Sequence, residues 1–248
     1  MSPLCRSWGC SEKLTFADSE MATQVTAHTR TDQLPQKVTL YSYHLSSCSW
    51  RVQLALLFKG IPYEYKAVDL SRGEQFSDEF TKLNPLQMVP VLAIDGVTLV
   101  DSIGILLYLE ERFPDKRPLL PKDLVQRAQI HQVVSLISAY IQPLQMGRIL
   151  ATIEAKFGKE EQLKWIQDVY RKGFSALEQI LIRTAGKYCF GDTVTLADIV
   201  LVPQFGNAIR LQMDLAPYPT IQRVGEALNE LPEVKSSVPA NQPDARKS

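Results

Sequence analysis

The sequence predicts an α/β domain followed by an all-helical domain. Short strand-like and helix-like segments alternate between residues 38 and 112, whereas long helical patterns fill the chain beyond residue 122. Prolines at positions 114, 118 and 121 separate the two regions and indicate a linker. The chain has 248 residues, which is enough for two such domains.

The first region opens with a strand, a helix and a second strand. Residues 37–43 form a strand-like run, and the helix-like run 51–59 ends at Gly60 and Pro62. The alternating stretch 63–68 predicts the second strand. Strands joined by a helix in so short a space indicate a right-handed parallel unit.

A hairpin and two helices complete the first domain. Asp95-Gly96 between apolar runs is a strong signal for a two-residue turn. Asp101-Ser102 precedes an apolar run and indicates the start of a helix. The expected ranges are 75–82 for a short helix, 89–94 and 97–100 for the strands, and 103–112 for the closing helix.

The second region is expected to be helical throughout. Pro143 should kink or interrupt its first long helical pattern. Thr195 and Asp198 fit a capping box before an apolar run. The polar tail beyond Pro232 is expected to fray. Besides the run after Thr195, the expected helices cover residues 124–140, 160–183 and 221–231.

Four segments follow from these patterns. We expect a disordered extension over 1–35, an α/β domain over 36–117, a helical domain over 118–240 and a flexible tail over 241–248. The extension shows no sustained periodicity, and its acidic residues are untypical of an organelle transit peptide.

The composition disfavours several kinds of partner. Lys plus Arg and Asp plus Glu number 27 each, so nothing favours binding to nucleic acid or to an anionic membrane. No apolar run reaches the length of a membrane span. Four cysteines are too few for a disulfide framework, and no metal-ligand spacing is present. We therefore expect a cytoplasmic protein without a metal.

The stretch from Ser46 to Arg51, Ser-Ser-Cys-Ser-Trp-Arg, carries the clearest chemical signal. It lies between the first strand and the first helix, where backbone N–H groups lack helical partners. An anion bound at this position is stabilised, and a thiol becomes more acidic. One serine could simply cap the helix, but a cap needs only one hydroxyl. His44, just before the motif, is expected to be an ordinary surface residue.

This motif resembles that of the zeta class of soluble glutathione transferases, the maleylacetoacetate isomerases. The resemblance runs from about residue 38 to 244 and implies a thioredoxin-like N-terminal domain with a four-stranded mixed sheet, an all-α C-terminal domain and a homodimer. Other matching stretches are Asn84-Pro85, Val89-Pro90, Ile141-Gln142-Pro143-Leu144-Gln145, 185–189, Gly191-Asp192 and Pro217-Tyr218-Pro219-Thr220.

The resemblance implies glutathione as the cofactor and assigns residues to it. Ser46 would donate a hydrogen bond to the glutathione thiolate, with Ser47 and Cys48 beside the sulfur. Val89 would pair with the cofactor through its backbone, before a cis Pro90. The remaining residues expected to bind glutathione are Ser49, Trp50, Arg51, Gln75, Asp101, Ser102 and Gln142.

The resemblance also implies the reaction, which is cis–trans isomerisation of maleylacetoacetate to fumarylacetoacetate in tyrosine and phenylalanine catabolism. Arg51 and Arg210 would hold the carboxylates of this small dicarboxylate. Leu45 and Met146 depart from the class, which often carries Arg and usually Asn at these positions. Both departures border the expected substrate mouth.

Three other functions remain open. Cys48 could form a mixed disulfide with glutathione, as in the omega-like thiol reductases, although no Cys-x-x-Cys motif is present. The same thiolate could act on other small electrophiles such as α-haloacids. The fold also serves as a non-catalytic interaction module.

Overall fold

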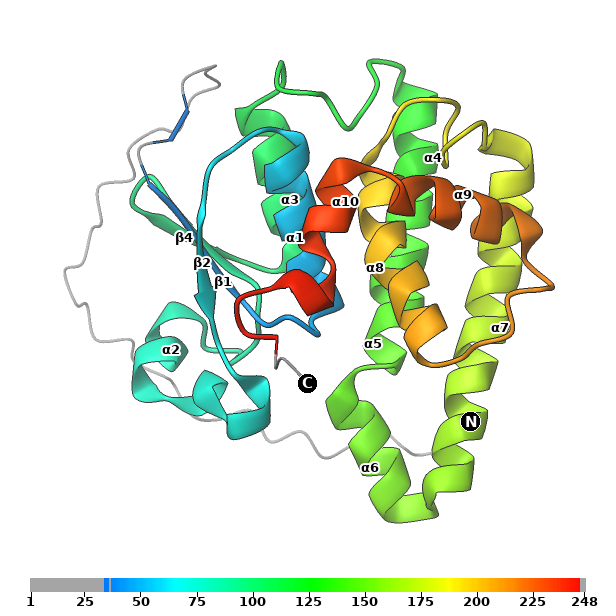
Figure 1. Cartoon of the computed structure of the whole chain (residues 1–248), viewed down its shortest axis with the longest axis horizontal. Helices are drawn as coiled ribbons and strands as arrows, with labels where there is room; N and C mark the ends of the chain where they lie inside the picture. The colour runs from blue at the N-terminus through cyan, green and yellow to red at the C-terminus, as the bar shows by residue number, and fades with distance from the viewer. Residues whose placement is uncertain (1–33, 36, 246–248) are drawn as a thin grey trace, which may run out of the picture.

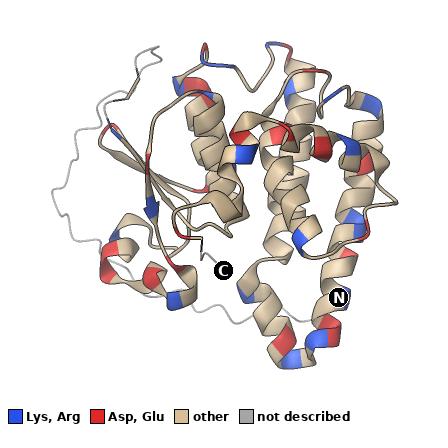
Figure 2. Cartoon of the chain, viewed as in Figure 1, with Lys and Arg blue, Asp and Glu red and all other residues tan. Residues whose placement is uncertain are grey.

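The computed structural model describes residues 34–35 and 37–245. A sheet flanked by helices forms one part of the molecule, and a cluster of long helices forms the other (Figure 1). Apart from Leu34 and Pro35, the extension predicted over 1–35 lies outside the described residues. Within the described part, acidic and basic residues are interspersed along the helices (Figure 2). No described helix is both long and apolar enough to cross a membrane.

The sheet has four strands in the order β2-β1-β3-β4. The parallel pair joins β1 to β2 and confirms the predicted strand–helix–strand unit. The pairs β1–β3 and β3–β4 are antiparallel, so the sheet is mixed and thioredoxin-like as expected. The strands are β1 (Val38–Ser42), β2 (Glu64–Ala67), β3 (Val91–Ile94) and β4 (Val97–Val100).

Two helices pack against each other on one side of this sheet, α1 (Ser47–Phe58) and α3 (Ser102–Arg112). Because side chains alternate along a strand, Leu92 packs into the main core while Val91 joins a smaller cluster that includes Phe80. Phe80 belongs to α2 (Asp78–Leu83). The single helix expected over 75–82 is instead one short 3₁₀ turn, η2 (Glu74–Phe76), followed by α2, since Ser77 caps α2 from an extended conformation.

The linker after α3 is held by a buried ion pair. Lys59 Nζ lies 2.7 Å from Glu110 Oε2, and both side chains are almost inaccessible to solvent. The Glu110 carboxylate also accepts hydrogen bonds from the backbone N–H groups of Leu119 and Leu120. Lys59 donates in addition to the carbonyl of Phe113. Breaking such a pair would leave a buried charge without a partner, so the linker is tightly anchored.

The helical domain differs from expectation in two places. The first long pattern is α4 (Leu124–Ser135) followed by a π-helical stretch, η3 (Leu136–Ile141), and the short α5 (Gln142–Leu144). Pro143 cannot donate a backbone hydrogen bond, which fits this interruption. The unpredicted helix is α6 (Gly147–Phe157), in which no residue is buried. The remaining helices are α7 (Lys159–Thr184), α8 (Leu196–Arg210) and α9 (Pro219–Asn229).

The expectation of a frayed tail beyond Pro232 is wrong for the described residues. A further helix, α10 (Pro232–Ser237), packs on α1, and the chain then returns along the first domain. The side chain of Ser237 accepts a hydrogen bond from Trp50, and that of Gln242 accepts one from Gln53. Buried polar contacts therefore hold this segment, and the flexible tail expected over 241–248 is ordered at least as far as Ala245.

Candidate active site at the start of helix α1

Helix α1 begins four residues earlier than predicted and brings the serine–cysteine motif into its first turn. Ser46 is the N-cap residue, and its Oγ accepts a hydrogen bond from the backbone N–H of Ser49 at 3.1 Å. Ser47 and Cys48 are the first helical residues, and no acidic side chain lies in this turn. The positive end of the helix is therefore not neutralised locally and favours an anionic ligand.

A cavity of about 140 Å³ opens beside this helix start. It is bounded by the turn before α1, by the end of α8 and by the segment after α10. Trp50 is buried and also forms part of the wall, since its indole ring faces Gly206. A Cβ atom at Gly206 would lie only 3.0 Å from that ring. The lining residues are His44, Leu45, Ser46, Ser47, Trp50, Gly206, Asn207, Arg210 and Pro239.

Arg210 provides this cavity with a permanent positive charge. It is the last residue of α8 and is exposed, and its Nη2 donates a hydrogen bond to Asn207 Oδ1 at 3.3 Å. That bond orients the guanidinium while leaving other N–H groups for an anion. Arg210 is therefore suited to bind a carboxylate near Ser46 and Ser47.

Arg51 does not line the cavity that holds Arg210. Its side chain is only 1% exposed, and its Nη1 donates to Ser102 Oγ at 3.3 Å, which joins α1 to α3. Burial lowers the pKa of Arg51, and the nearby Cys48 and Asp101 act in the opposite direction. Nε and Nη2 have no partner among the described residues. This geometry favours a role beside Ser102 over direct contact with a substrate carboxylate at Arg210.

A second group of polar residues lies at the start of α3. Asp101 caps the helix, and its carboxylate accepts hydrogen bonds at 2.9 Å from the backbone N–H groups of Ile103 and Gly104. Its φ of 70° is uncommon for a residue other than glycine and costs on the order of 1–3 kcal/mol. Ser102, the first helical residue, is 4% exposed. Such strain is concentrated at ligand sites. The N–H groups of Ile103 and Gly104 are already bonded to Asp101, which leaves the Ser102 hydroxyl as the donor at this helix start.

The remaining predicted residues lie on separate elements. The Val89–Pro90 peptide bond is cis, as the resemblance implied, and Val89 is buried directly before β3. Gln75 lies in the 3₁₀ turn η2 (Glu74–Phe76), and its Oε1 is buried without a hydrogen-bond partner in the described part of the chain. Gln142 is the first residue of α5 and is half-buried.

Several buried polar atoms of the predicted site residues could be paired by groups of glutathione. Ser49 Oγ, Arg51 Nε and Nη2, and Gln75 Oε1 are buried and unpaired among the described residues. Buried polar atoms are normally hydrogen-bonded, so each such atom calls for an explanation. Glutathione, a peptide with two carboxylates and two amides, carries groups that are complementary to these donors and acceptors.

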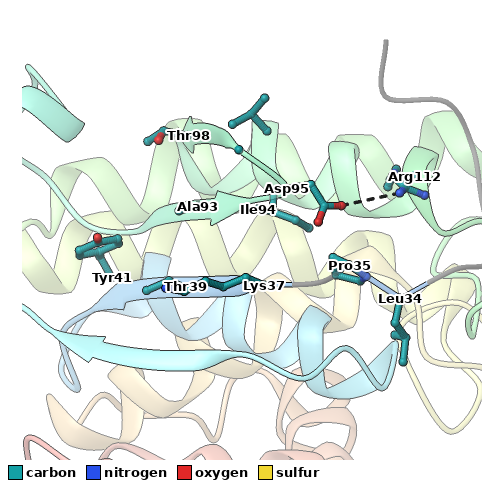
Figure 3. A pocket seen from close by; sticks show the side chains of 12 residues that line it. Leu34, Pro35, Lys37, Thr39, Tyr41, Ala93, Ile94, Asp95, Thr98 and Arg112 are labelled. Atoms are coloured by element: carbon teal, nitrogen blue, oxygen red, sulfur yellow. Dashed lines mark ion pairs between the residues drawn. The ribbon is translucent and has the colours of Figure 1, made fainter. Parts of the chain in front are cut away.

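A larger cavity, of about 720 Å³, lies on the opposite side of the sheet. Figure 3 shows Thr39, Tyr41 and Thr98 on this face, with Asp95 directed toward Arg112. None of the predicted site residues lines it. Of the predicted site residues, Ser46, Ser47, Trp50 and Arg210 line the smaller cavity instead.

Sequence reasoning missed several residues of the smaller cavity. Asn207 and Gly206 lie within α8 and Pro239 lies beyond α10, so each reaches the site only through tertiary packing. The spacing of Asn207 and Arg210, three residues apart on one helix, was the one available signal.

Comparison with known proteins assigns the fold to a family. Residues 40–117 match the family described as glutathione S-transferase, N-terminal domain, and residues 146–237 match glutathione S-transferase, C-terminal domain. The chain belongs to the glutathione S-transferase family. Its relatives place this transferase in the zeta class, with the maleylacetoacetate isomerases.

Relatives from animals and plants match this transferase over most of its length. Maleylacetoacetate isomerase of Mus musculus is 49% identical over 84% of this chain and 95% of the relative. Glutathione S-transferase Z1 of Arabidopsis thaliana is 44% identical over 86% of this chain and 96% of the relative.

Solved structures agree with these relatives. A holo structure of maleyl pyruvate isomerase, described as a bacterial zeta-class glutathione S-transferase, superposes with a TM-score of 0.80 at 39% identity, covering 84% of this chain and 100% of that chain. Maleylacetoacetate isomerase from Anaeromyxobacter dehalogenans with glutathione bound in its active site gives a TM-score of 0.77 at 42% identity, covering 85% and 98%.

Proposed function

We propose that this transferase is a glutathione-dependent isomerase that converts maleylacetoacetate to fumarylacetoacetate in tyrosine and phenylalanine catabolism. The main observation behind this proposal is that Ser46, Ser47 and Arg210 line the same cavity. A thiolate and a carboxylate bound there would each have a favourable partner. The names of the relatives support the same reaction.

Glutathione would lie across the positive ends of α1 and α3. Ser102, with Arg51 behind it, suits the γ-glutamyl carboxylate, and Asp101 suits the neighbouring amine. The backbone of Val89 can pair with the peptide as an added strand. Ser49, Trp50, Gln75 and Gln142 would complete the binding surface, Trp50 through its packing.

Bound glutathione would supply a thiolate that adds to the cis double bond and leaves again after rotation about the resulting single bond, which restores the double bond in the trans form. Ser46 donates its hydroxyl hydrogen to this thiolate while its oxygen stays bonded to the N–H of Ser49. Lowering a thiol pKa from roughly 8.5 toward 7 requires about 2 kcal/mol. One charge-assisted hydrogen bond together with the helix terminus can provide this, so no general base is needed.

The carboxylate substrate is held by Arg210, with Asn207 orienting the guanidinium. Ser47 lines the cavity and Cys48 follows it in the first turn of α1, and neither would act as the nucleophile. Leu45 is 44% exposed at the rim, where it presents an apolar surface to the substrate.

An isomerase assay tests this function directly. We expect purified protein to isomerise maleylacetone or maleylacetoacetate only when glutathione is present. Equal rates with and without glutathione, or no isomerisation at all, would overturn the proposal. Assays with α-haloacids in parallel would show whether the site also carries out dehalogenation.

A thiol reductase that uses Cys48 is the alternative with a structural observation behind it. The Cys48 thiol lies at the start of α1, is partly exposed and is free. Thiol-transfer activity that disappears in Cys48→Ser while isomerase activity is absent would favour this reading. Failure to bind immobilised glutathione would instead favour a non-catalytic module.

We also propose that the protein is a cytoplasmic homodimer. Large apolar side chains are exposed on α4 and α3, including Leu124, Val125 and Leu107. Light scattering at micromolar concentration should give twice the monomer mass, and a monomer would contradict the proposal.

Deletion of residues 1–32 should leave the melting temperature and glutathione binding nearly unchanged, since the proposed folded unit begins near Gln36.

A further inference from the structure

The last described residues return to the loop that carries the proposed thiol-activating serine. Residues 43–46 connect β1 to α1, and the N–H of Ser46 donates to the carbonyl of Tyr43 at 2.8 Å within this turn. Pro239, from the C-terminal segment, lines the same cavity as His44 and Ser46. The C-terminal segment is therefore part of the site's surroundings.

The carboxylate of Asp244 holds this turn from outside. Its Oδ2 accepts the backbone N–H of His44 at 2.9 Å and lies 3.3 Å from His44 Nδ1. Its Oδ1 accepts the hydroxyl of Tyr65, in β2, at 2.8 Å. One carboxylate thus ties the turn to the neighbouring strand across about 200 positions of sequence.

Burial and charge keep these bonds in place. The Asp244 and His44 side chains are 11% and 16% exposed. Burial, and then the Asp244 carboxylate, raise the pKa of Tyr65 far above its ordinary value, so its hydroxyl remains a donor. Hydrogen bonds to a charged acceptor in such surroundings are stronger than neutral ones.

We propose that Asp244 is a positioning residue that fixes the turn 43–46 and thereby the direction of the Ser46 hydroxyl. The inference rests on the proposed role of Ser46 in activating the glutathione thiol. His44 takes part through its backbone N–H and its ring, not as a proton-transfer group. Neither residue touches the reacting atoms.

The reason for the effect is geometric. Ser46 must point its oxygen at the N–H of Ser49 and its hydrogen at the thiolate at the same time. Misplacing the turn by a few tenths of an ångström weakens the second bond without unfolding α1. The expected consequence is a less acidic bound thiol with glutathione still bound.

Asp244→Asn is the decisive variant, because it keeps the size of the side chain and removes its charge and one acceptor. The thiol pKa of bound glutathione can be titrated by the ultraviolet absorption of the thiolate. We expect it to rise by about 0.5–1 unit and kcat near neutral pH to fall about two- to sixfold, with the glutathione Kd within twofold. An unchanged thiol pKa would overturn the proposal.

Gln242→Ala is the matched control in the same segment. It removes the contact with Gln53 Nε2 at 2.6 Å but leaves the carboxylate of Asp244 in place. We expect a lower melting temperature and an unchanged thiol pKa. If both variants lower the melting temperature and neither moves the thiol pKa, the segment is only structural and the proposal fails.

A double variant separates this inference from the proposed function. In a Ser46→Ala background, Asp244→Asn should add no further shift in the thiol pKa, whereas an equal added shift would overturn action through Ser46. The titration needs no isomerase activity. An inactive wild-type protein would therefore contradict the isomerase function, while a pKa shift caused by Asp244→Asn alone would still support the positioning role.

Discussion

Helices α8 and α1 both have an N-cap residue with a hydroxyl side chain, but the two helix starts have different roles. At α8, the Asp198 carboxylate accepts hydrogen bonds from the N–H and hydroxyl of Thr195 and from the N–H of Cys189, and it is fully buried. At α1, Ser46 satisfies one N–H, and the first turn contains no acid. We call the start of α8 the closed start, because its donors are satisfied within the protein. We call the start of α1 the open start, because it leaves donors for a ligand.

Removing the acid from the closed start should have the largest effect. Asp198→Ala leaves three donors without their acceptor in the core, which costs roughly 3–5 kcal/mol of unfolding free energy. Urea unfolding followed by circular dichroism measures this. The thiol pKa of bound glutathione should stay unchanged in the protein that remains folded. A loss below about 1 kcal/mol would mean that the cap is not structural.

Ser46→Ala tests the open start. A lost charge-assisted hydrogen bond costs roughly 1.5–3 kcal/mol, so kcat should fall about ten- to a hundredfold. The pH dependence of kcat should shift upward, because less thiolate forms at neutral pH. Kinetics of Ser47→Ala and Cys48→Ala provide the comparison. If Cys48→Ala alone abolishes activity while Ser46→Ala is neutral, the mixed-disulfide mechanism replaces the present one.

The far end of α8 sharpens the contrast, since this helix has a closed start and carries Arg210, the proposed substrate-binding residue, at its end. Arg210→Gln should raise KM for a carboxylate substrate about ten- to thirtyfold with little change in stability, because the side chain is exposed. Arg171→Gln, an exposed arginine paired with Asp168 on α7, is the matched control. Equal effects of the two substitutions would show that only general surface charge matters.

Ser49→Ala should have the smallest effect on stability. Its Oγ is buried without a partner, so its removal should change the unfolding free energy by less than about 1 kcal/mol. Binding of glutathione, measured by calorimetry, should weaken if this hydroxyl contacts the ligand. A stability loss above 2 kcal/mol would show that the hydroxyl already has a partner.

The sequence predicted those helix starts and turns that depend only on residues close together in the chain. The capping box at Thr195 and Asp198 and the turn at Asp95-Gly96 were readable because their signals lie within four residues. Helix α6 was missed although its apolar residues, Ile149, Leu150, Ile153 and Phe157, recur at helical spacing, so this signal was present and was overlooked.

Long-range contacts were beyond sequence reasoning. The sequence did not reveal that the Arg51 guanidinium is buried between two helices, where it is bonded to Ser102. The tail looked frayed because it is polar, yet its polar groups pair with residues of the first domain. Nothing in a single sequence pairs Asp244 with His44, because no periodic pattern connects positions so far apart.

The same return of the chain sets an order for assembly during biosynthesis. Tyr65 and Asp244 are 179 positions apart, so at about 5–20 residues per second the ribosome needs roughly 10–35 s to supply the second partner. The first domain leaves the ribosome with Trp50, Gln53 and Tyr65 still uncovered. The turn 43–46 therefore acquires its contact with Asp244 only after almost the whole protein has been made.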